Sequence, residues 1–195
     1  AAAAAGDDGG LVEALSRLFL AVPLGDDARH ALAARIRDAV PAGLPGRAVP
    51  PRNWHLTLRF LGDIGPVDAD RLAGVLDESD LGGAFEVTWG GLGAFPRPKR
   101  ATVLWVGASA GDEEMAALAA AVEEAVQRAG FAAEDRPFRL HLTLSRMRPD
   151  CDVRALLADA PPAGVTMPVD RVMLYRSHLG RGGARYEEIE EFPLD

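Results

Sequence analysis

The tetrapeptide His-Leu-Thr-Leu occurs twice in this chain, at residues 55–58 and at residues 141–144. The chain contains only four histidines and five threonines, so two identical pairings of these types are not expected by chance. Histidine gains or loses a proton near neutral pH, and a threonine hydroxyl donates a hydrogen bond to an oxyanion. Two such units indicate acid/base chemistry on a phosphoryl group, carried out between two related halves.

The offset of two residues between His and Thr is typical of one face of a β-strand, along which alternate side chains point the same way. His55 and Thr57 are therefore expected to share a face toward a cleft, as are His141 and Thr143. The leucines of both motifs are expected to point into a core, and the flanking apolar residues Trp54, Phe60, Phe138 and Leu140 with them. The alternative is an ordinary half-buried strand with a solvated polar face, but two copies in a histidine-poor chain favour function.

Two histidines on either side of one phosphorus atom can divide the proton transfers of a hydrolysis. A neutral imidazole takes a proton from water, and a protonated imidazole gives one to the departing ribose oxygen. Each role typically contributes about 10²–10⁴-fold to the rate. The threonine hydroxyls can bind the non-bridging phosphate oxygens. A strained cyclic phosphate needs no metal for this reaction, so the sequence predicts neither a metal nor another cofactor.

The charge distribution points to a small anionic substrate. The net charge of −8 argues against a general nucleic-acid coat protein. Four segments without any acidic residue nevertheless hold 13 of the 21 Lys and Arg residues, at 50–60, 95–105, 136–148 and 171–185. Depletion of acids in strands explains the missing carboxylates but not the surplus of arginine. A basic centre inside an acidic shell is what a phosphate ligand requires.

Length and composition predict one globular domain. Residues 1–10 are low in complexity and are interpreted as a disordered tail, which leaves a single bilobed domain over 11–195. Cys151 is the only cysteine, so an internal disulfide and a cysteine-based zinc site are excluded and a reducing cytoplasm is favoured. No apolar run approaches the length of a membrane span, so no membrane partner is expected. Nothing in the sequence points to an obligate protein partner.

The coarse pattern of elements predicts an α+β fold. Strands are predicted at 17–23, 54–61, 85–89, 102–106, 140–147, 169–175 and 185–190, and helices at 26–40, 66–76, 112–129 and 153–158. Strand–helix–strand occurs in both halves, and consecutive strands without a helix favour antiparallel pairing. We therefore expect two similar lobes of mainly antiparallel sheet, with helices outside and an active-site cleft between them.

Two glycine-rich segments are predicted to be loops. The segment 90–96 fails as a dinucleotide fingerprint, because Pro96 stands where the last glycine belongs and no helix follows, so a turn is expected there. The segment 177–183 is expected to be a second loop. Arg59 lies four residues after His55, so strict alternation places it on the same strand face as His55, although a solvent-facing role for it is equally open.

Arg146 lies five residues after His141, so strict alternation places it on the opposite strand face. It can reach the same site only if the strand ends or bulges after Leu144.

The chain resembles the two-histidine phosphoesterase superfamily, and within it the RNA 2′,3′-cyclic phosphodiesterases, also called 2′-5′ RNA ligases. The resemblance covers nearly all of residues 17–192. It rests on Asn-Trp-His-Leu-Thr-Leu-Arg-Phe-Leu-Gly at 53–62, Leu-Trp-Val-Gly at 104–107 after the glycine segment, and His-Leu-Thr-Leu-Ser-Arg at 141–146. The segment 174–177 with Tyr186 is also similar.

The resemblance implies hydrolysis of RNA 2′,3′-cyclic phosphate ends to 2′-phosphates, with RNA ends or small cyclic-phosphate nucleotides as binding partners. It implies that His55 is the proton donor and His141 the proton acceptor, and that the hydroxyls of Thr57 and Thr143 hold the phosphate. The predicted substrate-binding arginines are Arg146, Arg59, Arg176 and Arg181. Whether the reverse reaction, which joins ends through a 2′-5′ bond, has a role is left open.

Two other functions remain as alternatives. The first is a binding module of the same fold that holds a nucleotide or RNA end without turnover, which intact His and Thr in both motifs disfavour. The second is a metal-dependent hydrolase that uses His55 and His141 as ligands. No carboxylate lies within either motif, and Asp63 is the nearest acid to His55. Turnover of a cyclic phosphate and sensitivity to a chelator separate these alternatives.

Overall fold

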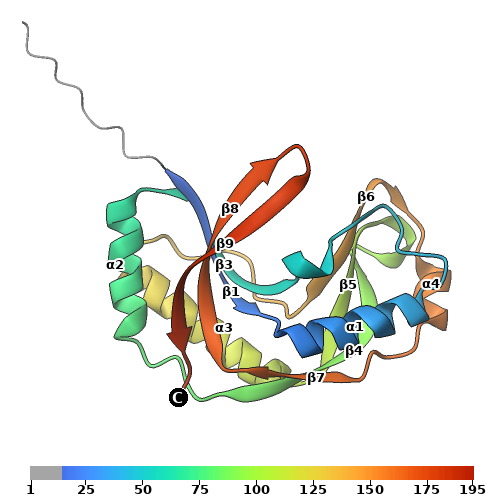
Figure 1. Ribbon diagram of the computed structural model, residues 1–195, viewed down its shortest axis with the longest axis horizontal. Helices are drawn as coiled ribbons and strands as arrows, with labels where there is room; N and C mark the ends of the chain where they lie inside the picture. Colours follow the sequence, from blue (N-terminus) through green and yellow to red (C-terminus); the bar gives the residue numbers. More distant parts are fainter. Residues whose placement is uncertain (1–14) are drawn as a thin grey trace, which may run out of the picture.

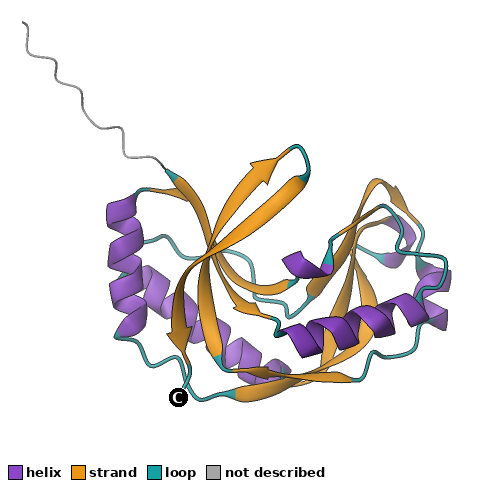
Figure 2. Ribbon diagram, viewed as in Figure 1, coloured by secondary structure: helices purple, strands orange, loops and turns teal. Residues whose placement is uncertain are grey.

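The computed structural model describes residues 15–195, and these form two antiparallel sheets and four α-helices (Figures 1 and 2). The predicted tail and the start of the predicted domain lie outside the described residues. The four-stranded sheet has the order β3-β1-β8-β9, and the five-stranded sheet has the order β2-β6-β5-β4-β7. All of the strand pairings are antiparallel. The predicted α+β class with two lobes is confirmed.

The first sheet contains β1 (Ser16–Pro23), β3 (His55–Ile64), β8 (Arg171–Gly180) and β9 (Gly183–Pro193). The second contains β2 (Arg47–Ala48), β4 (Phe85–Phe95), β5 (Ala101–Ala110), β6 (Leu142–Cys151) and β7 (Val165–Val169). The α-helices are α1 (Asp26–Ala39), α2 (Pro66–Asp77), α3 (Asp112–Arg128) and α4 (Arg154–Asp159). Two short 3₁₀ turns, η1 (Pro51–Asn53) and η2 (Pro98–Arg100), precede β3 and β5.

The helices form where apolar residues recur at helical spacing behind an acidic first turn. In α1, Asp26 and Asp27 stand at the start, where the helix dipole favours negative charge, and Leu32 and Ile36 are buried one turn apart. In α3, three acids open the helix and its apolar face is buried. The helices α2 and α3 pack on each other, α3 packs on β3, and α1 lies against β7 (Figure 1). No helix in residues 15–195 is long and apolar enough to cross a membrane.

Three predicted boundaries were wrong. The glycine segment 90–96 is not a turn, because β4 continues through it to Phe95 and pairs with β5. The segment 177–183 is a hairpin rather than a loop, since β8 and β9 pair as far as Gly180 and Gly183. The strand predicted at 169–175 is two strands in different sheets, β7 and β8, which separate at Asp170.

A β-bulge occurs at the fourth residue of each His-Leu-Thr-Leu motif. In the first motif, Thr57 pairs with Ala21 and Arg59 pairs with Leu20, so Leu58 is the extra residue. In the second, Thr143 pairs with Trp105 and Ser145 pairs with Leu104, so Leu144 is the extra residue. Because side chains alternate along a strand, one extra residue reverses the faces of all residues after it.

Candidate active site

The two motifs face each other across a cleft between the sheets. A cavity of about 460 Å³ is lined by Thr57 and Phe60 from β3 and by His141, Thr143 and Arg146 from the second sheet. His55 lies two residues before Thr57 on β3 and lines a second cavity of about 610 Å³ with Tyr175 and Tyr186. Three of the four predicted His and Thr side chains therefore line one cavity, and the fourth lies beside it on the same strand as Thr57.

Both histidine rings are held in the same way. The Nδ1 atom of His55 lies 2.8 Å from the Asn53 carbonyl oxygen, and Nδ1 of His141 lies 2.7 Å from the Arg139 carbonyl oxygen. A carbonyl only accepts a hydrogen bond, so Nδ1 carries the proton in each ring. The Nε2 atom then accepts a proton when the ring is neutral and donates one when the ring is charged. Each ring is poised to transfer a proton at Nε2.

Aromatic side chains surround His55. The Phe19 ring lies 4.8 Å from the imidazole between ring centroids, and Tyr186 meets it edge-on at 4.9 Å. Burial among these rings lowers the pKa of His55 to about 4, although the hydrogen bond to the Asn53 carbonyl acts in the opposite direction. Burial also raises the pKa of Tyr175 to about 12. With this pKa, His55 is neutral at pH 7.

Trp105 and two glycines support His141. The Trp105 ring lies 6.5 Å from the His141 imidazole, and Phe95 meets the imidazole edge-on at 5.1 Å. A Cβ atom at Gly93 would lie 2.2 Å from the indole ring, and one at Gly107 would lie 3.0 Å from it. The indole therefore occupies the space that side chains at these positions would need. This explains why glycines stand in β4 and β5 without interrupting either strand.

The bulges give Phe60 and Arg146 equivalent places in the two halves. Arg146 pairs with Val103, two residues from Trp105, so it lies on the same face as Thr143. The condition that the sequence set for Arg146, a bulge at Leu144, is thus met. Phe60 was expected in the core, and that prediction was wrong. The bulge at Leu58 turns its ring to the cleft face, where 58% of the side chain is exposed and Phe19 lies 5.9 Å away.

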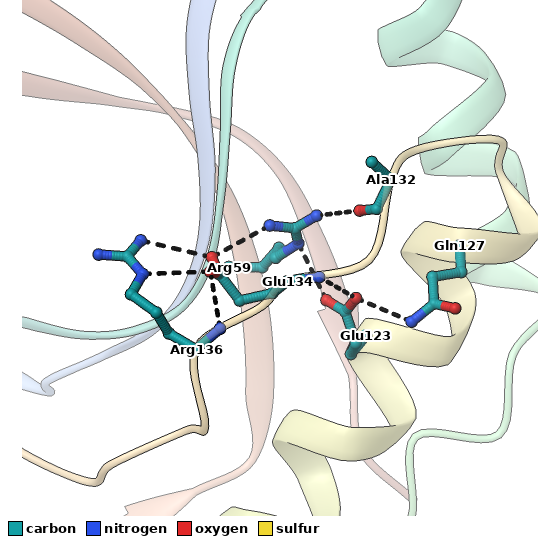
Figure 3. A network of polar contacts seen from close by, with 6 residues as sticks. All are labelled: Arg59, Glu123, Gln127, Ala132, Glu134 and Arg136. Atoms are coloured by element: carbon teal, nitrogen blue, oxygen red, sulfur yellow. Dashed lines mark hydrogen bonds and ion pairs between the residues drawn. The ribbon is translucent and has the colours of Figure 1, made fainter.

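Arg59 lines the cavity that contains His141 and Thr143, and two carboxylates hold its guanidinium. Its guanidinium is 12% exposed and pairs with Glu123 on α3 at 2.9 Å and with Glu134 at 3.2 Å (Figure 3). It also donates a hydrogen bond to the Ala132 carbonyl. The Glu134 carboxylate in turn accepts hydrogen bonds from Arg136. Arg59 therefore joins the first motif strand to the segment that leads to His141, and the substrate contact predicted for it stays a prediction.

The other two predicted arginines lie on the β8–β9 hairpin. Arg176 pairs with Glu187 at 3.6 Å, on the face of the hairpin opposite to Tyr186. Arg181 is exposed in the turn at the hairpin tip. The structure thus brings Arg146 into the cavity of His141, leaves Arg181 exposed in the hairpin turn and engages Arg176 with a carboxylate.

Two further residues of the site were not singled out from the sequence. Asn53 donates a side-chain hydrogen bond to the Ala184 carbonyl at 2.8 Å, and this bond fixes β9 beside His55. Arg47 lies directly opposite Arg146 in β2. The segment around Arg47 is rich in proline and glycine and gave no strand signal. No group of three or more His, Cys, Asp or Glu side chains within residues 15–195 could hold a metal ion.

Comparison with known proteins gives a consistent result. The family model of the 2′-5′ RNA ligase superfamily matches residues 26–181. A protein of Aeropyrum pernix named RNA 2′,3′-cyclic phosphodiesterase is 35% identical over 167 residues, which cover 81% of this chain and 92% of that protein. A protein of Aquifex aeolicus with the same name is 35% identical over 170 residues, which cover 84% of this chain and 89% of that protein.

Solved structures agree. Escherichia coli LigT complexed with 3′-AMP superposes with a TM-score of 0.76 at 26% identity, over 92% of this chain and 98% of that one. TT0787 of Thermus thermophilus superposes with a TM-score of 0.75 at 29% identity, over 91% and 97%.

Proposed function

The chain belongs to the 2′-5′ RNA ligase superfamily, and from this membership and the geometry of its cleft we propose that it is an RNA 2′,3′-cyclic phosphodiesterase. In this proposal it opens the cyclic phosphate at an RNA end and leaves a 2′-phosphomonoester. The observation that carries the proposal is the matched pair of imidazoles, each bound through Nδ1 to a carbonyl, with a threonine two residues later on the same cleft face. The alternative of a binding module gives no reason for two proton-transfer groups.

The reaction needs two proton transfers. The Nε2 atom of His141 takes a proton from water as the water oxygen bonds to phosphorus. The bond between phosphorus and the ribose 3′-oxygen breaks, and the protonated Nε2 of His55 gives its proton to that oxygen. The 2′-oxygen keeps the phosphate. After turnover a proton passes from His141 to solvent and His55 takes one up, so the protein returns to its starting state.

The hydroxyls of Thr57 and Thr143 approach the phosphate from opposite sheets. Each can donate a hydrogen bond to a non-bridging oxygen, where negative charge is greatest in the transition state. Arg146 lies on the same face and adds a permanent positive charge with a planar fork of donors. Because these groups stand on strands of two packed sheets, they need little reorganisation when the substrate arrives.

The low pKa of His55 constrains its role as the proton donor. The ring is neutral at pH 7, since burial holds its pKa at about 4. A phosphate anion beside the ring stabilises the charged form and raises the pKa. Substrate binding is therefore the event that charges His55. This coupling supplies a proton donor only when a phosphate is present.

Product identity tests the proposal. A dinucleotide that ends in a 2′,3′-cyclic phosphate is incubated with the protein in excess chelator, and the product is identified by ³¹P NMR. The expected product is the 2′-phosphate alone, formed at an undiminished rate. Tight binding without turnover would support the binding module, and loss of activity in the chelator would support the metal-dependent hydrolase.

The same cleft could also join RNA ends. An RNA 5′-hydroxyl in the place of the attacking water would give its proton to His141 as its oxygen bonds to phosphorus. The bond between phosphorus and the ribose 3′-oxygen would break, with a proton from His55 to that oxygen, and a 2′-5′ bond would remain. Incubating the cyclic end with a high concentration of an RNA 5′-hydroxyl end tests this, with the joined product as the expected result. The single cysteine supports a reducing cytoplasm as the compartment of this RNA-processing enzyme.

A further inference from the structure

Two arginines stand directly opposite each other at the edge of the cleft. β2 contributes only two residues to the five-stranded sheet, and Arg47 pairs with Arg146 while Ala48 pairs with Ser145. Directly opposed residues of an antiparallel pair project to the same face. Arg47 therefore lies on the face that carries Arg146 and Thr143, one strand further from the reacting phosphate. Both arginine side chains are exposed.

The backbone fixes this juxtaposition. Gly46 has a φ of +72°, and a Cβ atom there would lie 2.5 Å from the Arg146 carbonyl oxygen, so only glycine allows β2 to approach β6 so closely. The Val49 amide donates a hydrogen bond to the Leu144 carbonyl at 2.8 Å. The Trp54 indole donates another to the Val49 carbonyl at 3.0 Å. The short strand is thus held on both sides, and Arg47 has a defined position.

The pairing of two arginines is electrostatically unfavourable by itself. Like charges that lie directly opposite each other destabilise a strand pair. Among residues 15–195, no carboxylate lies within ion-pair distance of Arg47 or Arg146, whereas Arg59 and Arg171 each have two and Arg176 has one. The chain carries a net charge of −8, so carboxylates are abundant elsewhere. Two guanidiniums without a carboxylate partner on one face are available to bind an anion from outside the chain.

The β8–β9 hairpin of the four-stranded sheet also approaches Arg47. A Cβ atom on Gly183 would lie 3.0 Å from a guanidinium nitrogen of Arg47. The charge of Arg146 acts on Tyr186, which stands on the same strand as Gly183, and opposes the rise that burial causes in the pKa of this tyrosine. Tyr186 contacts His55. The pair of arginines therefore lies beside the reacting cleft and is bordered by both lobes.

We infer that Arg47, beside Arg146, forms a second phosphate subsite that binds the phosphodiester joining the terminal nucleotide of the RNA to the preceding one. This inference rests on the proposed function, because it names which cyclic phosphates the cleft prefers. Arg146 faces the reacting phosphate and Arg47 faces the next one. A nucleoside 2′,3′-cyclic monophosphate has only the reacting phosphate and leaves this subsite empty. The preferred substrate is an oligonucleotide end of at least two residues.

The test compares adenosine 2′,3′-cyclic monophosphate with the adenylyl dinucleotide that ends in the same cyclic phosphate. The wild type should have a KM about tenfold lower for the dinucleotide, because a hydrogen-bonded charge contact of this kind is usually worth at least that factor. Arg47→Ala should raise the KM for the dinucleotide about tenfold and leave that for the monophosphate unchanged. Arg47→Lys should give a KM for the dinucleotide between those of the wild type and Arg47→Ala, since lysine keeps the positive charge and lacks the planar set of guanidinium donors.

Arg35→Ala is the matched control, because Arg35 is exposed on α1 and distant in sequence from both motifs. It should change neither KM. The logarithmic salt dependence of the dinucleotide KM should become shallower in Arg47→Ala by about 0.7, the value for one phosphate of a single strand. Thermal unfolding of each variant monitors the fold.

Equal wild-type KM values for the two substrates would overturn the inference and leave the proposed function standing. Equal losses on both substrates in Arg47→Ala would also overturn it, because they would assign Arg47 to the reacting phosphate. If the wild type hydrolysed neither substrate, the proposed function itself would fail.

Discussion

A single methyl group added at Gly93 tests whether the indole of Trp105 positions His141, the proposed general base. Gly93 lies in the middle of β4, and its backbone does not require a positive φ, so alanine fits the local conformation. The added Cβ atom would lie 2.2 Å from two atoms of the Trp105 ring. The Trp105 ring in turn lies beside the His141 imidazole.

The size of the effect follows from this overlap. Carbon atoms rest about 3.5–4.0 Å apart, so the indole must retreat by more than about 1 Å. Forcing an extra methyl group into a packed site costs about 1–3 kcal/mol of stability. A displacement of about 1 Å at a catalytic group can cost about 10²-fold in rate. Gly93→Ala should therefore lower kcat by about 10²-fold while the protein remains folded.

The assay is steady-state hydrolysis of the dinucleotide cyclic phosphate, with thermal unfolding measured in parallel. Gly91→Ala is the matched control on the same strand, since nothing lies within 4 Å of a Cβ atom there. It should keep wild-type kcat. Adding Trp105→Phe to Gly93→Ala should recover part of the lost rate by making room. A wild-type rate in Gly93→Ala, or equal losses at the two glycines, would refute the positioning role of Trp105.

Three more outcomes are expected. Thr57→Ala and Thr143→Ala should each lower kcat/KM by about tenfold with little change in unfolding temperature, because each removes a hydrogen bond to the phosphate. NMR titration should give the His55 imidazole a pKa of about 4 that rises with inorganic phosphate. This folded-state pKa lies below the unfolded value of about 6.5. The wild type should therefore lose up to about 3 kcal/mol of unfolding free energy as the pH falls from 6.5 to 4. The His55→Gln variant should lose less over the same range. Arg59→Met should lower the free energy of unfolding, measured in urea, by about 1–3 kcal/mol, because it leaves two carboxylates without their cation. Adding Glu134→Gln should restore part of that free energy, since it removes one of these unpaired charges.

The strand faces of the two motifs could be predicted from the sequence because they depend only on residue spacing. The offset of two between His and Thr implies a shared strand face, and the structure places Thr57, His141 and Thr143 around one cavity and His55 in a second one. Leu56, Leu142 and Leu144 alternate with polar residues and are buried, as this pattern predicts, whereas Leu58 at the bulge is only partly buried. The helices followed from acidic first turns and apolar spacing.

Phe60 was misplaced because a β-bulge is a feature that strict alternation of side chains cannot reveal. The bulge at Leu58 brings Phe60 to the cleft, and the ion pairs of Arg59 with Glu123 and Glu134 are contacts that the sequence did not indicate. Nothing in the tetrapeptide marks its fourth residue as the extra one. The sequence indicated a bulge only at Arg146, because its expected contact with the phosphate conflicted with the strand face that strict alternation gives it.

Glycine was misread for a related reason. Gly93 is a turn signal by composition, yet it stands in a strand because the indole of Trp105 needs its space. That reason is a contact between neighbouring strands, and local sequence does not contain it. Arg47 was missed because a strand of two residues has no periodicity.

Hydrolysis by the two histidines is tested most directly by single-turnover rates of four proteins: the wild type, His55→Asn, His141→Asn and the variant with both changes. The substrate is the dinucleotide cyclic phosphate at neutral pH in chelator. Each single change should slow hydrolysis by at least about 10²-fold. The double variant should be little slower than the worse single variant, because groups that act as one unit lose their effect together. A near-wild-type rate in either single variant would contradict the paired acid/base mechanism.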